Sequence, residues 1–195
     1  MGRKRVIDQE QVLDAAQRVV ARDGAARLTL DAVAVEAGIS KASVLYDYKS
    51  KQALIAALVD RSVAADNAFN AQMTERVAGT TNAAIRGRLL AAAAPFPDDF
   101  RAVALNLCAA LAQDAELRQT IQRNQDEVIA DISASSANPR GALLAYLALE
   151  GLKLLESLDY HTWPRDERDR ILREINWLID TEPKQDMPLP IPAGG

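Results

Sequence analysis

Apolar residues recur every three to four positions along most of the chain, which is the spacing of one face of an α-helix. Residues 8–50 carry three short segments of this kind. Asp8 is a predicted N-cap, with Gln11 completing a capping box, and Gly24 ends the first segment. Thr29 and Ser40 precede the second and third segments as N-caps. The pattern therefore predicts three short helices in this part of the chain.

The rest of the chain continues with longer segments at the same spacing, separated by loops, glycine or proline. They cover about residues 50–77, 82–94, 98–111, 117–132, 139–158 and 164–179, with a loop at 133–138. Ser50 is the predicted N-cap of the first of them, and Pro139 suits the first turn of the segment after the loop. Asn124 and Gln125 interrupt the apolar stripe of the segment at 117–132. Since no stretch alternates as a strand would, the expected fold is all-α with about nine helices. We expect three units, which are residues 1–52, a helical unit at 53–181, and a proline-rich disordered tail at 182–195.

Residues 30–51 have the features of a helix-turn-helix. Ala34 is small where the two helices would cross, Gly38 supplies the positive φ of the turn, and Val44 is a branched apolar residue that fills the gap. The residues expected on the outer side of the second helix are polar, namely Ser40, Lys41, Ser43 and Tyr46. A purely structural helix pair would not need this outer set. Residues 1–52 are therefore predicted to insert a helix into the major groove of DNA.

Charge is distributed unevenly along the chain, whose net charge of −4 looks wrong for a DNA-binding protein. Residues 1–52 hold nine Lys or Arg against seven Asp or Glu, whereas the remainder holds 14 against 20. Arg3, Lys4 and Arg5 form a basic arm before the first helix. Positive charge is thus concentrated where DNA contact is predicted, although such an arm is equally expected of a solubilising chain end.

The composition sets further bounds. About half of the residues are apolar (49%) and few are aromatic (5%), which favours packed helices with a sizeable core. The single cysteine, Cys108, excludes an internal disulfide and any cysteine-based zinc site. Nothing resembles a signal peptide, and the longest apolar run, residues 142–149, is too short to span a membrane. We expect a soluble cytoplasmic protein with no membrane partner.

The N-terminal part of the chain resembles the TetR/AcrR family of one-component transcriptional regulators. The resemblance covers residues 8–60 and is carried by the capped first helix, the long fourth helix, and the runs DGAARLTLDAVAVEAGISK and SVLYDYKSKQAL. It implies that the third helix reads DNA, with base contacts at residues 41–43. It also implies that Lys51 and Thr29 contact phosphates and that Tyr46 contacts the DNA backbone.

Two residues of the predicted DNA-binding set depart from the family pattern. The set comprises Arg3, Lys4, Arg5, Thr29, Ser40, Lys41, Ala42, Ser43, Tyr46, Asp47, Lys49 and Lys51. Asp47 stands where the family often has His or another uncharged or basic residue. Its carboxylate would repel phosphates, accept from a cytosine amino group, or pair with a lysine such as Lys51. Lys49 replaces a common proline and adds positive charge. These alternatives leave the operator sequence open.

A single helix-turn-helix contacts too few base pairs for strong selection, so a homodimer is expected. Two copies related by a two-fold axis would read a palindrome with half-sites ~34–36 Å apart, or a multiple of that distance. The last two predicted helices carry more apolar surface than one side needs, and the family resemblance points to them as the dimer helices. The predicted interface is Leu143, Leu147, Leu154, Leu155, Ile171, Ile175 and Leu178. Alternatively, these residues form ordinary core within one chain.

Regulation requires a second site that is coupled to the separation of the two reading heads. A ligand among the fourth to eighth predicted helices could tilt the fourth helix. The predicted lining residues are Phe69, Met73, Phe96, Phe100, Asn106, Gln125, Tyr146 and Glu150. Tyr146 and Glu150 lie four residues apart on one helix face, a combination that favours a cationic ligand. The alternative is that Glu150 bonds a neighbouring helix and that the Phe and Met side chains are core.

These features predict a ligand-responsive DNA-binding regulator, most commonly a repressor, that a small-molecule effector releases from a palindromic operator. An enzyme is disfavoured because His161 is the only histidine, Cys108 has no partner in the sequence, and no glycine-rich phosphate loop is present. No cofactor or metal is expected. The second possibility is a helical small-molecule-binding or adaptor protein with weakened DNA binding. Asp47 and the acidic total support it slightly, whereas the basic arm and the lysines within residues 41–51 weigh against it.

Overall fold

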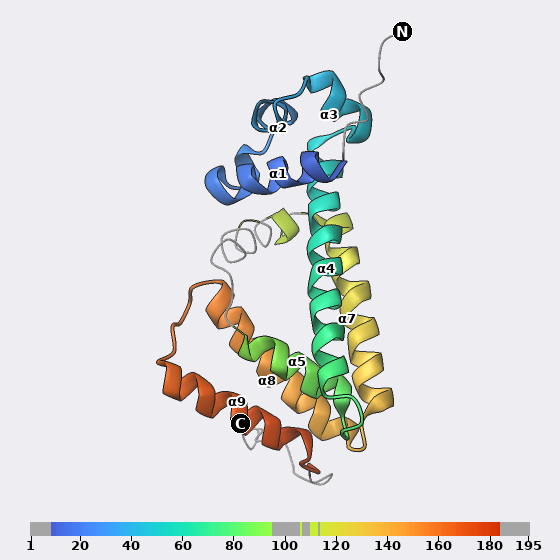
Figure 1. Cartoon of the computed structure of the whole chain (residues 1–195), viewed down its shortest axis with the longest axis vertical. Coiled ribbons are helices and arrows are strands. Elements are labelled where there is room, and N and C mark those ends of the chain that lie inside the picture. The colour runs from blue at the N-terminus through green and yellow to red at the C-terminus, as the bar shows by residue number, and fades with distance from the viewer. Residues whose placement is uncertain (1–8, 95–105, 107–109, 113, 184–195) are drawn as a thin grey trace, which may run out of the picture.

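The computed structural model describes residues 9–94, 106, 110–112 and 114–183, and these residues form an all-α protein, as predicted (Figure 1). The elements are α1 (Gln9–Asp23), η1 (a 3-10 turn, Ala25–Arg27), α2 (Leu30–Ala37), α3 (Lys41–Asp47), α4 (Lys51–Arg76), α5 (Ala83–Ala93), α7 (Ala115–Ser135), α8 (Pro139–Ser157) and α9 (Arg165–Ile179). Most of the helix predicted over 98–111 lies outside the described residues, although residues 106 and 110–112 are helical. The Asp8 cap, the basic arm, Cys108 and residues 184–195 of the tail also lie outside them.

Side-chain caps confirm the predicted helix starts in the N-terminal part. Thr29, Ser40 and Ser50 each place a hydroxyl oxygen 3.0–3.1 Å from a backbone N–H three residues further on. Between α2 and α3, Gly38 has φ 67° and ψ 32°, a left-handed conformation that a Cβ would disfavour. Together the caps and this glycine produce the predicted tight turn.

The connection between α7 and α8 is shorter than predicted. Helix α7 continues to Ser135, whose hydroxyl donates to the Asp131 carbonyl oxygen at 2.7 Å, so the loop expected at 133–138 contains only residues 136–138. Pro139 occupies the first turn of α8, as predicted, and Asn138 caps that helix by accepting from the Gly141 N–H at 3.3 Å.

Helix α4 connects the two ends of the molecule. Helices α1, α2 and α3 lie at its N-terminal end, α7 runs beside it, and α5, α8 and α9 pack together at the far end (Figure 1). The crossing of α4 and α5 is close because residue 87 is a glycine. A Cβ on Gly87 would lie 2.5 Å from the Thr74 Cα, closer than two such atoms can approach.

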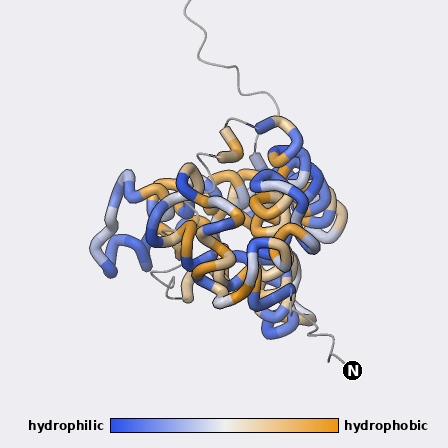
Figure 2. The backbone as a smooth tube through the Cα atoms, turned by 90° about the horizontal axis from the view of Figure 1, so that it is seen from above, coloured by the Kyte–Doolittle hydropathy of each residue, from blue (hydrophilic) through white to orange (hydrophobic). Residues whose placement is uncertain are grey.

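Buried side chains form two separate clusters, one toward each end of α4. The first joins α1, α2, α3 and the start of α4, and includes Val44 and Leu54 at 0% exposure. The second joins α5, α7, α8 and α9 around Ile132 and Leu149. Seen from above, many hydrophobic stretches lie toward the middle and hydrophilic ones toward the periphery (Figure 2). Burial of one such side chain contributes about 1.5–3 kcal/mol to the stability of the fold. Each cluster is therefore a hydrophobic core that stabilises its own end of the molecule.

Candidate nucleic-acid interface and effector region

The outer side of α3 presents polar side chains at one end of the molecule. Tyr46 is 78% exposed and Lys41 is exposed as well. Ser43 is half-buried, and its hydroxyl lies 2.8 Å from that of the capping Ser40. Val44 is fully buried and holds the opposite side of the helix on the core. The helix thus turns one face inward while Lys41 and Tyr46 remain accessible to a partner.

The lysines beside this face have weak protein contacts. Lys41 Nζ donates to Asp31 Oδ2 at 2.8 Å, and both side chains are more than half exposed. Lys49 Nζ donates to the Tyr46 carbonyl oxygen at 2.9 Å and lies 5.5 Å from the centroid of the Tyr46 ring. Ala42, next to Lys41, is exposed. An exposed ion pair contributes ~0–1 kcal/mol, so a DNA phosphate could compete with Asp31 for Lys41. Lys49 has no acidic partner to displace among its contacts named above.

Lys51 and Thr29 both have structural partners near the start of their helices. Lys51 Nζ donates to the Ala26 carbonyl oxygen at 2.6 Å, which holds η1 against the start of α4. Because an ammonium group has three donors, Lys51 can keep this bond and still bind a phosphate. The Thr29 hydroxyl oxygen caps α2, and the residue stays exposed, so its proton can still be donated to a phosphate oxygen.

Asp47 is bonded to α1 rather than to Lys51, which the sequence offered as one possible partner. Its Oδ1 accepts from Gln9 Nε2 at 3.3 Å, whereas the Lys51 ammonium is directed at Ala26. The carboxylate is half-buried at the C-terminal end of α3. Its negative charge, after burial, is the second cause that raises the pKa of the neighbouring Tyr48 hydroxyl.

Two groups of contacts around α1 were not found from the sequence. Arg18 and Arg22 donate to Glu36 at 2.8 and 2.9 Å, which joins α1 to α2 and lowers the pKa of the Glu36 carboxyl. Arg61 in α4 reaches back to α1, where its shortest ion pair, with Asp14, is 2.7 Å. The available signal was spacing, because residues 54, 58 and 61 share one face of the helix.

Tyr146 and Gln125, two of the predicted effector-lining residues, meet between α8 and α7. Tyr146 is 3% exposed, and its hydroxyl donates to Gln125 Oε1. Burial, together with the negative charge of Glu150, raises the pKa of Tyr146 to about 12. Glu150 forms a 2.9 Å ion pair with Lys153 on its own helix rather than with a neighbouring helix. Its charge is already paired, which weakens the argument for a cationic ligand.

Further polar groups lie on the α4 side of this region. Asn67 donates to Asn124 Oδ1 in α7 at 2.6 Å, and its own buried amide oxygen has no hydrogen-bond partner among the residues that the structure describes. On the same helix, Met73 is 5% exposed and Phe69 is 41% exposed. Asn124 and Gln125 are the two residues that interrupt the apolar stripe of α7. The interruption therefore marks polar contacts between α7 and its neighbouring helices.

Asn106, another predicted effector residue, does not extend this group. Asn106 lies against the N-terminal part of the molecule, where its Nδ2 donates to the Val20 carbonyl oxygen at the end of α1, at 3.1 Å. Phe96 and Phe100 lie outside the described residues.

Leucines of α8 form an exposed apolar stripe. Leu144, Leu147, Leu154 and Leu155 are 44, 56, 51 and 38% exposed. Gly151 lies within this stripe, and no atom of the described residues approaches within 4 Å of the position that its Cβ would take. The other predicted interface residues are less accessible, since Leu143, Ile171 and Leu178 are half-buried and Ile175 is 3% exposed. Ile175 packs in the core of its own chain.

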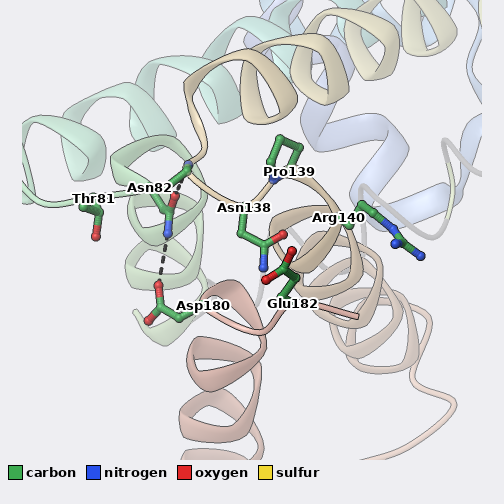
Figure 3. Close-up of a pocket in the computed structure, with 8 residues that line it drawn as sticks. Thr81, Asn82, Asn138, Pro139, Arg140, Asp180 and Glu182 are labelled. Atoms are coloured by element: carbon green, nitrogen blue, oxygen red, sulfur yellow. Dashed lines mark hydrogen bonds between the residues drawn. The ribbon is translucent and has the colours of Figure 1, made fainter. Parts of the chain in front are cut away.

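A pocket of about 510 Å³, lined mainly by polar residues (Figure 3), lies at the end of the molecule away from α3 (Figure 1) and not among the predicted effector residues. Its lining is Thr81, Asn82, Ala137, Asn138, Pro139, Arg140, Asp180 and Glu182. Asn82 is 4% exposed with φ 62°. It donates to Asp180 Oδ1 at 3.1 Å and accepts from the Ala137 N–H at 2.8 Å. The pocket therefore sits where Asn82 joins the turns after α4 and α7 to the end of α9.

In the part of the chain that the structure describes, no group of three or more His, Cys, Asp or Glu side chains is arranged to hold a metal ion. No helix in that part is long and apolar enough to cross a membrane.

Two family models match the chain. The model for bacterial regulatory proteins of the tetR family matches residues 12–58. The model for the tetracyclin repressor-like C-terminal domain matches residues 80–180, which is more than half of the chain. No curated protein matches it.

Solved structures share the fold over most of their length. A TetR transcription regulator from Haloarcula marismortui is 18% identical, with a TM-score of 0.69 over 88% of this chain and 95% of that one. A TetR family member from Streptomyces coelicolor is 20% identical, with a TM-score of 0.66 over 89% and 98%. The multidrug binding protein EbrR, complexed with malachite green, is 23% identical, with a TM-score of 0.66 over 92% and 100%. The likeness to solved structures shows the fold, and the two family models establish that this chain belongs to the TetR family of transcriptional regulators.

Proposed function

We propose that the protein binds a palindromic operator as a homodimer and leaves it when a small molecule binds to its C-terminal part. The observation that carries the proposal is the accessible polar face of α3, supported on a capped helix-turn-helix at the end of α4. Residues 41–43 would contact base edges, while Thr29, Tyr46, Lys49 and Lys51 would contact the DNA backbone. The arm at residues 3–5 would add phosphate contacts. A repressor is the commoner outcome within this family.

The exposed stripe of α8 supports a homodimer as the DNA-binding form. The four leucines of the stripe are each more than one-third exposed, which is unfavourable for an isolated chain in water. Pairing two chains about a two-fold axis would bury both copies of the stripe at once. Gly151, within the stripe, would let two helices approach closely. Leu147 and Leu154 would form the centre, with Leu143, Leu155, Ile171 and Leu178 around them, while Ile175 would support the interface from beneath.

The effector would bind among α4, α7 and α8, near the Tyr146–Gln125 pair. EbrR, one of the structural neighbours, is a multidrug binding protein with malachite green bound, which makes an aromatic small molecule a reasonable class for this chain. Glu150, Met73 and Phe69 would complete the surroundings of such a site. The protein would act in the cytoplasm, where its DNA lies, by binding rather than by catalysis.

Selection from random duplex DNA, followed by band-shift titration of the enriched sequence, tests this proposal. A palindrome should be enriched, and its affinity should fall about 10³-fold or more between 50 and 200 mM salt if roughly six phosphates are neutralised. A protein that prefers no palindrome over bulk DNA would contradict the proposal. That outcome would favour the second possibility, a helical adaptor or small-molecule-binding protein that no longer recognises DNA.

A further inference from the structure

We propose that Arg61 in α4 is a positioning residue that sets the angle of the DNA-reading unit, α1–α3, on α4. The proposal rests on the dimeric DNA binding proposed above. In a dimer, this angle determines how far apart the two copies of α3 lie, and therefore which half-site spacing the protein accepts.

The Arg61 guanidinium is bonded to one face of α1 at several points. Nη1 donates to Asp14 Oδ1 at 2.7 Å and approaches Glu10 Oε2 at 3.5 Å. Nη2 donates to the Leu13 carbonyl oxygen at 3.1 Å and to Gln17 Oε1 at 2.5 Å. These α1 residues, at positions 10, 13, 14 and 17, follow the i, i+3, i+4, i+7 spacing of a single helix face. A planar guanidinium bonded to several groups on that face holds α1 in one orientation.

Arg61 lies far enough from the other attachment points for its contact to resist rotation of the DNA-reading unit. The DNA-reading unit is joined to α4 by the chain at residues 48–51 and by the bond from Lys51 to Ala26. Arg61 lies ten residues further along α4, about 15 Å away at the rise of an α-helix. One attachment point would permit the unit to pivot, whereas a second at this distance resists rotation. Between the two points lie Leu54 and Leu58, whose apolar contacts are not directional and permit small sliding.

Contacts within the unit carry the orientation of α1 to α3. Glu36 in α2 accepts from Arg18 and Arg22 of α1. Gln9, at the start of α1, donates to Asp47 at the end of α3. Because α1 is fixed to both helices, turning α1 on α4 turns the reading helix with it.

The chain offers a matched control in Arg86. Its guanidinium is also largely buried, with 20% side-chain exposure against 21% for Arg61. It donates to both Asp180 carboxylate oxygens at 2.7 and 2.9 Å and to Asn176 Oδ1 at 2.6 Å. Arg86 lies at the far end of the molecule, so Arg86→Gln removes a comparable set of bonds without touching the DNA-reading unit.

Distances between spin labels in the full-length dimer test the proposal without any operator. One label is attached per chain at Val35→Cys, an 83% exposed position on α2, in a Cys108→Ser background. We expect one narrow distance distribution without further change and in Arg86→Gln, and a distribution about twofold broader in Arg61→Gln. Arg61→Lys keeps the charge but loses the planar fork, so it should give an intermediate width, and it replaces Arg61→Gln if that variant does not fold.

A second readout uses palindromes whose half-site spacing is varied by one base pair. The unmodified protein and Arg86→Gln should discriminate the best spacing from the next by about tenfold, and Arg61→Gln by about threefold or less. The role of Arg61 would be overturned if the Arg61 and Arg86 variants gave distance distributions of equal width and discriminated half-site spacings equally. This holds even if both distributions are broader than that of the unmodified protein. No dipolar signal between chains, or no palindrome preference before any change at residue 61 or 86, would instead overturn the proposed dimeric function.

Discussion

Single residues of the DNA-reading unit differ in how strongly they are bonded to the rest of the protein. Lys41 has an exposed partner, Asp31, which it can exchange for DNA at little cost. Lys51 is bonded to the Ala26 carbonyl oxygen in η1, and its ammonium group keeps donors for a phosphate. The first arrangement suits a residue that reads bases, and the second suits one that anchors the backbone.

Replacing Lys51 and Lys41 separately should reveal this difference. Lys51→Ala should weaken binding about equally on all sequences and reduce the slope of log affinity against log salt by about 1, because one phosphate contact is lost. Lys41→Ala should instead change which bases are preferred in a selection. Lys153→Ala, far from α3, is the control. Indistinguishable effects of the first two variants on random DNA would contradict the division of roles.

The buried hydroxyl of Tyr146 predicts a pH-dependent contribution to stability. Its pKa is raised to about 12, so above pH 10 the unfolded state loses this proton before the folded state does, and stability falls as pH rises from 10 to 12. Tyr146→Phe should cost about 1 kcal/mol at pH 8 through the lost bond to Gln125, and this deficit should shrink at pH 11. Urea unfolding at both pH values measures it. A deficit that grows with pH would show that the tyrosine ionises more easily in the folded protein.

Residue patterns predicted local features well and contacts between distant elements poorly. The caps at residues 29, 40 and 50, the left-handed Gly38 and the buried Val44 follow from short-range rules. The bonds from Arg61 to α1 and from Gln9 to Asp47 could not be predicted, because they depend on how helices far apart in the sequence are placed. The interruption at residues 124 and 125 is intermediate, since the sequence marked a polar spot without naming its partners.

At the scale of elements, the long helix α4 is shaped by what packs against it. Its boundaries followed from the cap at Ser50 and the apolar stripe, whereas its close crossing with α5 depends on Gly87. Glycine in a helix usually signals weakness, so its role as a contact point is visible only once the neighbouring helix is placed.

Gly87→Ala should therefore destabilise the protein, although alanine favours helix. The new Cβ would lie 2.1 Å from Thr74 Oγ1 and 2.5 Å from the Thr74 Cα, and forcing the helices apart should cost roughly 1–3 kcal/mol. If Gly87→Ala unfolded at the same temperature as the unmodified protein or higher, the crossing of α4 and α5 would be able to adjust to the new Cβ, contrary to this prediction.

At the scale of the whole molecule, α4 connects two hydrophobic cores, one below the helix-turn-helix and one among the helices that are proposed to form the dimer. The exposed α8 stripe is the feature that most needs a second copy. Leu147→Glu places a charge at a 56% exposed position, so the single chain should keep its fold while the dimer is lost. Val35→Glu, exposed on α2, should remain dimeric. Sedimentation velocity distinguishes the two states, and a dimeric Leu147→Glu would place the interface elsewhere.

Sedimentation equilibrium of the protein with the palindrome that it selects tests the central claim most directly. The account predicts two chains on each duplex, and no complex for Leu147→Glu at the same concentration. A single chain bound per palindrome, or equal binding by Leu147→Glu, would contradict the account that paired copies of α3 read the operator together.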